Sequence, residues 1–286
     1  MSKLRALVAD ELAQPVDARV SAMATAIATK HGTASRAVLF YGSCLRQSQL
    51  EGLMLDFYLI VSDYRSAYEK SWLAAANRLI PPNVFYFEHG GLVSKYAVLS
   101  ETDFHRLNGP ETSNVSVWAR FAQPSRLVWA ADSPARDRAV DAVSRAAPTL
   151  IAAARPDPRE KPLALWRRAF ALTYSAELRA ERAARASSVV DLEPGRYERF
   201  TAPVLEAAVT MRPRGSWARR RIEGKSLTIL RLAKASLTFA GGAEYIAWKI
   251  NRHAGTDIKL KPWQRRHPLL AGLSLLPRLL RSGAVR

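Results

Sequence analysis

A glycine-serine pair and an aspartate further along the chain have the residue types and spacing to do phosphate chemistry. The short apolar run 36–41 ends at Gly42-Ser43, and Asp56 lies near the start of a second apolar run, 55–61. A Gly-Ser turn can bring backbone N–H groups and a hydroxyl close to triphosphate oxygens. A carboxylate on the neighbouring strand can hold Mg²⁺ against the same phosphates. The pattern predicts a site for a metal-bound nucleotide.

The surroundings of Asp56 favour this interpretation over a turn followed by a surface aspartate. Asp56 lies inside Met54-Leu-Asp-Phe-Tyr-Leu-Ile-Val61, which is otherwise apolar. A carboxylate placed in such a strand costs free energy unless a partner satisfies it. We therefore expect Asp56 to have a ligand or a cation beside it.

The elements that must position these residues follow from periodicity and turn signals. We predict strands at 36–41, 55–61, 83–88, 92–99 and 126–130, the third and fourth joined as a hairpin through His89-Gly90-Gly91. Helices are predicted at 2–30 with an interruption at Pro15, at 66–79, from Ser100, from Ser133 as N-cap, at 161–186 and from Ser216 to about Arg252. The fold class is therefore α+β, with a mixed sheet flanked by helices. We expect three regions: 1–132 as an α/β head, 133–211 as a helical domain and 212–286 as a basic, helical extension.

The charge of the chain is concentrated at its C-terminal end. The net charge is +18, and residues 212–286 carry 17 Lys or Arg against 3 acids, which is +14. A segment with this charge is expected to bind the phosphates of nucleic acid or of an anionic bilayer. The alternative is a charged face that is simply solvated. Tryptophans interleaved with these bases suit a lipid headgroup layer. The residues expected to bind membrane or lipid phosphate are Lys225, Arg231, Lys234, Trp248 and Lys249. Packing of the aromatic residues into the helical core is the other interpretation.

Cysteine usage and hydropathy bear on the compartment. Cys44 is the one cysteine of the chain, so no internal disulfide forms, which fits a reducing compartment. The first twenty residues contain acids and no apolar core stretch, so we expect no secretory signal. The longest apolar run, 268–280, is too short to span a bilayer. We expect a protein without a transmembrane segment that lies on a membrane surface.

The spacing of Gly42-Ser43 and Asp56 resembles nucleotidyltransferases of the DNA-polymerase-β type. That superfamily carries Gly-[Gly/Ser], about ten residues, then Asp-x-[Asp/Glu] on a strand. Tyr58 stands where its second acid belongs. A metal would then need another ligand, for which Asp63, Glu88 and a substrate phosphate are the candidates.

Five segments in order resemble the mitochondrial-type phosphatidate cytidylyltransferases, a family with bacterial members. These segments are Tyr41-Gly42-Ser43 followed by Gln47, Met54-Leu-Asp-Phe57, Lys95-Tyr-Ala-Val-Leu-Ser100, Ala119-Arg-Phe-Ala-Gln-Pro124 and Leu172-Thr-Tyr-Ser-Ala-Glu-Leu-Arg179. The similarity runs from about residue 40 to 180 and is looser near 224–249. Cys44 and Gln123 depart from the family's pattern.

The resemblance implies a nucleotidyltransferase-like head and a Mg²⁺-dependent reaction of CTP with phosphatidic acid that gives CDP-diacylglycerol and pyrophosphate. It implies that Gly42 and Ser43 hold the CTP triphosphate and that Asp56 binds Mg²⁺. It also implies that Lys95 and Arg120 neutralise phosphate oxygens, with Asp56 and Lys95 as catalytic residues and Arg120 as a nucleotide-binding one. Simple surface charges are the alternative for Lys95 and Arg120. The expected location is peripheral, on the cytoplasmic face of a bacterial inner membrane.

Two other functions stay open on the sequence. A nucleotidyltransferase acting on RNA or another polynucleotide would use the basic extension to track a phosphate backbone. No RNA-recognition signature is present, so we expect no nucleic acid partner. A non-catalytic nucleotide sensor or membrane adaptor is the second alternative, and Tyr58 is its best support.

Overall fold

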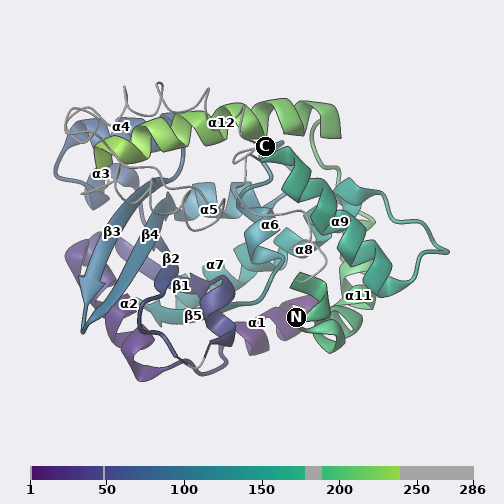
Figure 1. Ribbon diagram of the computed structural model, residues 1–286, viewed down its shortest axis with the longest axis horizontal. Coiled ribbons are helices and arrows are strands. Elements are labelled where there is room, and N and C mark those ends of the chain that lie inside the picture. The colour runs from purple at the N-terminus through teal and green to yellow at the C-terminus, as the bar shows by residue number, and fades with distance from the viewer. Residues whose placement is uncertain (1, 48, 178–188, 239–286) are drawn as a thin grey trace.

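The computed structural model describes residues 2–47, 49–177 and 189–238. At its centre is a five-stranded mixed sheet in the order β3-β4-β2-β1-β5 (Figure 1). The strands are β1 (Ser35–Tyr41), β2 (Met54–Val61), β3 (Asn83–His89), β4 (Leu92–Ser100) and β5 (Ser125–Ala130). Strands β2 and β4 are parallel, and the other neighbouring pairs are antiparallel. The predicted α+β class and all five predicted strands are confirmed.

Helices cover both faces of the sheet, as Figure 1 shows. They are α1 (Lys3–Leu12), α2 (Ala18–Lys30), α3 (Tyr64–Ala67), α4 (Ser71–Leu79), α5 (Glu101–Asn108), α6 (Trp118–Phe121), α7 (Ser133–Ser144), α8 (Ala146–Ala154), α9 (Pro162–Ala176), α11 (Pro194–Ala208) and α12 (Trp217–Thr238). Two short 3₁₀ turns, η1 (Gly32–Ala34) and η2 (Ser43–Arg46), flank β1.

The central strand β2 shows why both faces need a cover. Leu55, Phe57 and Leu59 alternate onto one face, where they share a buried cluster with the apolar stripe of α2. Tyr58 and Ile60 point to the opposite face, into a second cluster. A strand that is buried on both faces has a nearly continuous run of apolar residues in its sequence. Residues 55–61 have such a run, interrupted only by Asp56.

Several helix boundaries differ from the predicted ones. The predicted helix 66–79 is two helices, α3 and α4, because Tyr68 and the lysine that precedes α4 have extended backbone. The N-cap of α7 is Asp132, whose carboxylate accepts a hydrogen bond from Ala135 N at 2.7 Å, so Ser133 is already helical. Helix α9 ends at Ala176, and the rest of the predicted helix 161–186 lies largely in 178–188, outside the described residues.

The second buried cluster crosses the boundary predicted at residue 132. It joins Leu39 and Tyr58 of the sheet to Trp166 of α9 and Val204 of α11. Thus the sheet and the helices that follow it share one core. The predicted division into 1–132 and 133–211 stays a prediction about independent folding.

Helix α12 lies along the upper edge of the view in Figure 1, beside α4 and across the sheet from α2. In the described part of the chain, no helix is long and apolar enough to span a bilayer. Most of the predicted basic extension, including Trp248 and Lys249, lies outside the described residues.

Candidate functional site

Four side chains form a row across the sheet face that α12 and α6 cover. The strand registers pair Tyr41 with Asp56, Asp56 with Lys95, and Lys95 with Tyr86. Residues paired in this way project to the same face of a sheet. The fold therefore brings Asp56 and Lys95, which are 39 positions apart in the sequence, to one place.

The Gly-Ser turn meets Asp56 at the end of β1. Gly42 has φ of 93°, a backbone conformation that is strained for any residue with a side chain. A Cβ at this position would also lie 3.3 Å from Asp56 Oδ2. Glycine is required here for both reasons. Ser43 follows at the start of η2 and is exposed. The structure therefore brings Gly42, Ser43 and Asp56 together as the sequence predicted.

Asp56 is half-buried and lies beside a cation. Lys95 Nζ is 2.9 Å from Asp56 Oδ1, and the two side chains are 23% and 21% exposed. Oδ1 itself is buried and accepts no hydrogen bond of regular geometry. The distance and the charges make the contact an ion pair, and they leave lone pairs on this oxygen for a second cation. Thus the expectation of a charged partner for Asp56 is met by Lys95.

Arg120 lies on the same side of the sheet, in α6. Its Nη1 donates to the Ser116 carbonyl oxygen and lies 3.9 Å from Glu177 Oε1. Burial works against the charge on Arg120, but Glu177, Tyr58 and Tyr41 together raise its pKa. Arg120 is therefore a half-buried cation with protein partners, its side chain 31% exposed.

Arg231 of α12 joins this cluster, which differs from its expected place at a membrane surface. Its Nε donates to Pro81 O at 2.8 Å, and its Nη1 donates to Ser116 Oγ at 3.0 Å. Burial lowers its pKa. Ser116 contacts both Arg120 and Arg231, so two guanidinium groups from distant parts of the sequence meet at one serine.

Lys234, one helical turn further on, is buried in the same interface. Its Nζ donates to the carbonyls of Ile80 and Pro82, in the turn between α4 and β3. Lys225 is exposed on the outer side of α12. Of the three described bases expected to bind membrane, Lys225 alone is on the surface, because the other two hold α12 on the head.

Tyr58, at the position of the missing acid, is part of an aromatic cluster. Its ring centroid is 5.3 Å from that of Tyr41 and 5.2 Å from that of Phe121, and the residue is 2% exposed. Burial raises the pKa of its hydroxyl. A carboxylate here would be buried among rings, which explains in physical terms why an acid is disfavoured at this position.

Of the candidates for a second metal ligand, Asp63 is too distant from Asp56, and Glu88 has another partner. Asp63 caps α3 by accepting hydrogen bonds from Arg65 N and Ser66 N, and it lies seven residues beyond Asp56, roughly 20 Å along an extended chain. Glu88 is two strands and two residues from Asp56, about 11 Å by sheet spacing, and it accepts a hydrogen bond from Tyr86. The substrate phosphate is the candidate that fits.

Asp56 fits Mg²⁺ as a single protein ligand. Among the described residues, no group of three or more His, Cys, Asp or Glu side chains comes together to hold a metal. Mg²⁺ at nucleotide sites is commonly held by one or two carboxylates together with substrate phosphates. The buried Oδ1 of Asp56 and the adjoining Gly-Ser turn match that arrangement.

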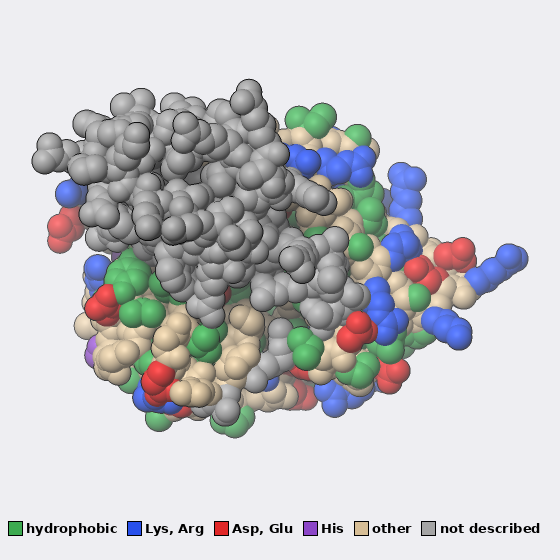
Figure 2. Space-filling view, in the orientation of Figure 1, with side chains coloured by type: hydrophobic (Ala, Val, Ile, Leu, Met, Phe, Trp, Pro, Cys, Tyr) green, Lys and Arg blue, Asp and Glu red, His purple; other side chains and the backbone are tan. Residues whose placement is uncertain are grey.

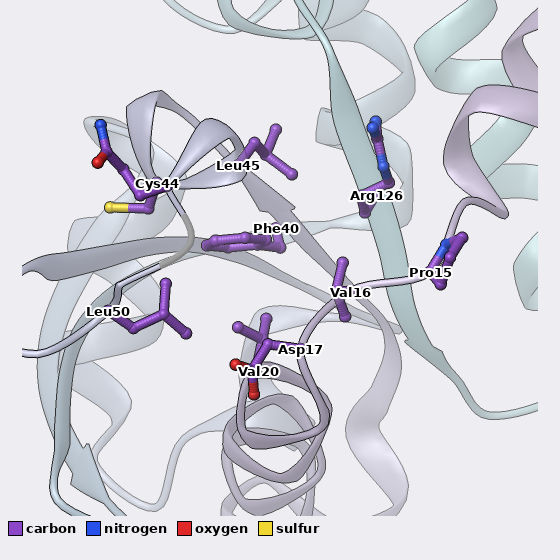
Figure 3. Close-up of a pocket in the computed structure, with 10 residues that line it drawn as sticks. Pro15, Val16, Asp17, Val20, Phe40, Cys44, Leu45, Leu50 and Arg126 are labelled. Carbon is purple, nitrogen blue, oxygen red and sulfur yellow. The ribbon is translucent and has the colours of Figure 1, made fainter.

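Two cavities flank the central strands, one on each face. The smaller, about 140 Å³, contains the candidate site residues Tyr41, Tyr58, Lys95, Arg120 and Arg231 in its lining. The larger, about 380 Å³, lies on the α2 face between α2, η2 and β5 (Figure 3). It is lined mainly by apolar side chains around Phe40, and Asp56 is not in its lining. Asp56, Gly42 and Ser43 are not in the lining of the smaller cavity either, but Lys95 and Arg120 are, so the smaller cavity is the one that adjoins the candidate site.

Sequence reasoning missed two residues of this cluster. Glu177 is a 7% exposed acid that follows α9, and Arg231 was assigned to the membrane. The segment 172–179 contains Glu177 and carried part of the family resemblance, which was a usable signal. Arg231 had none, because one base within a basic segment is indistinguishable from its neighbours.

In comparisons with known proteins, no family model and no curated protein matches this chain. The functional assignment therefore rests on the residues and their geometry.

Proposed function

We propose that this chain is a Mg²⁺-dependent nucleotidyltransferase that transfers CMP from CTP to phosphatidic acid at an anionic membrane surface. The observation that carries the proposal is the approach of Asp56 to Gly42 in a turn whose glycine has φ of 93°. It combines an anion-accepting turn with a carboxylate for the metal. The motif order described for the sequence selects CTP and phosphatidic acid as substrates.

Each residue has a part in the proposed reaction. Gly42 and Ser43 bind the CTP triphosphate, and Asp56 holds the metal against it. Mg²⁺, when bound, offsets charge that develops on the α-phosphorus and on the leaving pyrophosphate. Lys95 and Arg120 neutralise phosphate oxygens. An acceptor oxygen forms a bond to the α-phosphorus while the bond to the β-phosphate oxygen breaks.

The acceptor explains how the reaction can proceed without the second acid. A polymerase must activate a hydroxyl group, whereas a phosphate monoester has a second pKa of about 6 and is largely ionised near neutral pH. Such a nucleophile needs positioning and charge screening more than it needs a base.

The exposed side of α12 supports a lipid surface in preference to a polynucleotide. Ile222, Ile229 and Leu230 are 72%, 40% and 47% exposed, and Lys225 lies among them in the sequence. Figure 2 shows hydrophobic and basic side chains together over the start of α12. Apolar residues with cations suit a bilayer interface, whereas a nucleic acid site needs the cations without the aliphatic side chains.

A non-catalytic nucleotide sensor is the second candidate function. The observation in its favour is Lys95, whose ammonium group already pairs with the carboxylate proposed to hold the metal. Binding of CTP without turnover under all lipid conditions would establish this alternative.

The first test measures transfer of label from radiolabelled CTP to phosphatidic acid in liposomes with Mg²⁺. We expect labelled lipid from the wild-type chain and a loss of about 100-fold or more in Asp56→Ala, because metal and triphosphate binding are both removed. Asp10→Ala removes an exposed acid on α1 and serves as the control. A folded, CTP-binding protein that makes no labelled lipid would rule out the phosphatidate assignment, and RNA primers in place of liposomes test the polynucleotide alternative.

A further inference from the structure

The cavity beneath α12 is built from distant segments. Its lining comes from β1, β2, β3 and the turn before it, β4, the segment at α6, and α12. The lining residues are Tyr41, Phe57, Tyr58, Pro82, Val84, Lys95, Ala97, Ser116, Arg120 and Arg231. Among these described residues none is acidic, so the cavity presents three cations and two tyrosine hydroxyls to whatever enters it.

The charges around the cavity favour an anion. Arg120 and Arg231 both donate to Ser116, and the charge of Arg120 contributes to lowering the pKa of Arg231. The nearby acids are Asp56, paired with Lys95 at 2.9 Å, and Glu177, 3.9 Å from Arg120. Three cations against two acids leave one positive charge, and Lys234 behind Arg231 supplies up to one more.

Arg231 has donor capacity that the described residues do not use. Its Nε and Nη1 have partners, but its Nη2 is buried and has no hydrogen-bond partner among the residues that the structure describes. A buried N–H without a partner costs about 1–3 kcal/mol, and more for a charged group. The N–H groups of a guanidinium can donate hydrogen bonds to two oxygens of a phosphate at once. The orphaned donor therefore points to a ligand with acceptor oxygens.

The volume restricts the ligand to a small group. A cavity of about 140 Å³ holds a few water-sized groups, since a water occupies about 30 Å³ in the liquid. A terminal phosphate fits this space, whereas a nucleotide with its base, sugar and three phosphates does not. In the proposed function the nucleotide lies outside this cavity, at the Gly42-Ser43 turn.

We propose that this cavity binds a phosphate monoester, with Arg120 and Arg231 as its principal donors. The inference rests on the proposed function, in which that monoester is the headgroup of the acceptor lipid. A monoester carries close to two negative charges near neutral pH, which matches the excess of cations. A phosphodiester headgroup has one charge and a second substituent, and the cavity excludes it.

The site is complete only when α12 is docked on the head. Arg231 is supplied by α12, whose backbone also packs against the end of α9: a Cβ at Gly224 would clash with the Ala176 carbonyl. Lys234 fixes the same helix to the turn before β3. The basic region therefore delivers a ligand-binding residue and is more than an electrostatic anchor.

The test is calorimetric binding of inorganic phosphate, glycerol 3-phosphate and a soluble short-chain phosphatidic acid to the full chain. We expect each to bind wild-type protein, and Arg231→Ala to weaken binding at least about tenfold, because a charge-assisted hydrogen bond is lost. Arg231→Lys, which keeps the charge without the fork, should be intermediate and covers the case in which the alanine variant fails to fold. Arg221→Ala, an exposed arginine on the same helix, is the matched control and should bind as wild type.

The ligand series separates the possible sources of the phosphate. Tighter binding of short-chain phosphatidic acid than of glycerol 3-phosphate assigns the site to a lipid headgroup, and equal binding assigns it to a soluble monoester. Short-chain phosphatidylglycerol, a diester, should not compete. Unchanged phosphate affinity in folded Arg231→Ala or Arg231→Lys would overturn the proposal. So would a loss of CTP affinity in these variants with phosphate binding intact.

Failure of this inference is distinguishable from failure of the proposed function. If no liponucleotide forms but Arg231→Ala loses phosphate binding, the subsite stands and the transfer reaction falls. If liponucleotide forms and folded Arg231→Ala keeps the wild-type KM for phosphatidic acid, the reaction stands and the subsite falls.

Discussion

The Asp56 carboxylate lies beside Gly42 in the space where a side chain on that residue would begin. A Cβ on Gly42 would be 3.3 Å from Asp56 Oδ2, and φ of Gly42 is 93°. The turn and the carboxylate therefore constrain each other: the glycine permits the close approach, and a side chain on this residue would crowd the carboxylate in addition to straining the backbone. This mutual constraint is the firmest evidence that the two form one site.

Gly42→Ala should lose activity out of proportion to its loss of stability. The backbone of Gly42, with φ of 93° and ψ of −165°, lies in a region that residues with a side chain essentially do not occupy, at a cost of about 1–3 kcal/mol, and the new methyl group also crowds the Asp56 carboxylate. We expect a fall of at least about tenfold in kcat/KM for CTP, because misplacing a metal ligand weakens transition-state binding. Steady-state kinetics and urea unfolding measure the two effects.

Gly91→Ala is the control for the effect of placing a side chain on a residue with positive φ. Gly91 has φ of 75° at the β3–β4 turn, and a Cβ there meets nothing within 4 Å. Its alanine variant should lose similar stability and keep full activity. Equal activity losses in both variants would mean that strain, and not contact with Asp56, explains the effect.

Tyr58→Asp should destabilise the protein without raising the rate. The introduced carboxylate would be buried among Tyr41, Phe104 and Phe121, at a cost of about 3 kcal/mol or more. Tyr58→Phe keeps the ring packing and should cost under about 1.5 kcal/mol. A large gain in kcat for Tyr58→Asp would contradict our view that an ionised acceptor makes a second acid unnecessary.

The strands and the primary site were predictable because their signals are local. Period and turn residues defined β1 and β2, and Gly42-Ser43 and Asp56 lie at the junctions of those elements. The one long-range step was that the two strands are neighbours, and the β1–β2 register confirms it by pairing Tyr41 with Asp56.

The rest of the site depends on tertiary packing that no local pattern encodes. Arg231 and Lys234 look like the other bases of residues 212–286, and their inward direction is fixed by the carbonyls of Pro81, Pro82 and Ile80, about 150 positions earlier. Glu177 is buried because α6 and α9 bring Arg120 beside it. Such contacts depend on which face of α12 packs against the head. In a segment with this many bases, the pattern of apolar and charged residues does not specify that face.

Breaking the Glu11–Arg196 pair should destabilise the sheet and the helical half together. Arg196 Nη2 donates to Glu11 Oε1 at 2.9 Å, which joins α11 to α1, and the side chains are 5% and 11% exposed. Glu11→Gln leaves a buried guanidinium with a weaker partner, so we expect a loss of about 3 kcal/mol or more. Because one core crosses residue 132, unfolding should be a single transition in urea.

Asp141→Asn provides the comparison for the buried pair. Asp141 pairs with Arg5 at 2.5 Å but is 52% exposed, so its loss should cost under about 1 kcal/mol. Two separate urea transitions, with one unaffected by Glu11→Gln, would instead support independent folding of 1–132 and 133–211.

Docking of α12 should strengthen as the pH rises above neutrality. Burial, followed by the neighbouring charge of Arg231, lowers the pKa of Lys234 to about 7, against about 10.4 in an unfolded chain. Between these two values the unfolded chain binds a proton that the folded chain does not, so stability rises with pH across that window. Below about pH 7 both states are protonated, and Lys234 contributes no pH dependence.

Lys234→Met removes this titration and so isolates it. Urea unfolding of wild type and variant at pH about 6, 8 and 10 gives the difference in free energy of unfolding at each pH, in which the other titrating groups cancel. We expect the difference to grow in favour of wild type from pH about 7 to 10, and the same measurement on Lys225→Met, an exposed lysine of α12, to give a flat line. A flat line for Lys234→Met as well would mean that Lys234 keeps its proton in the folded protein and that its bonds to Ile80 and Pro82 outweigh its burial.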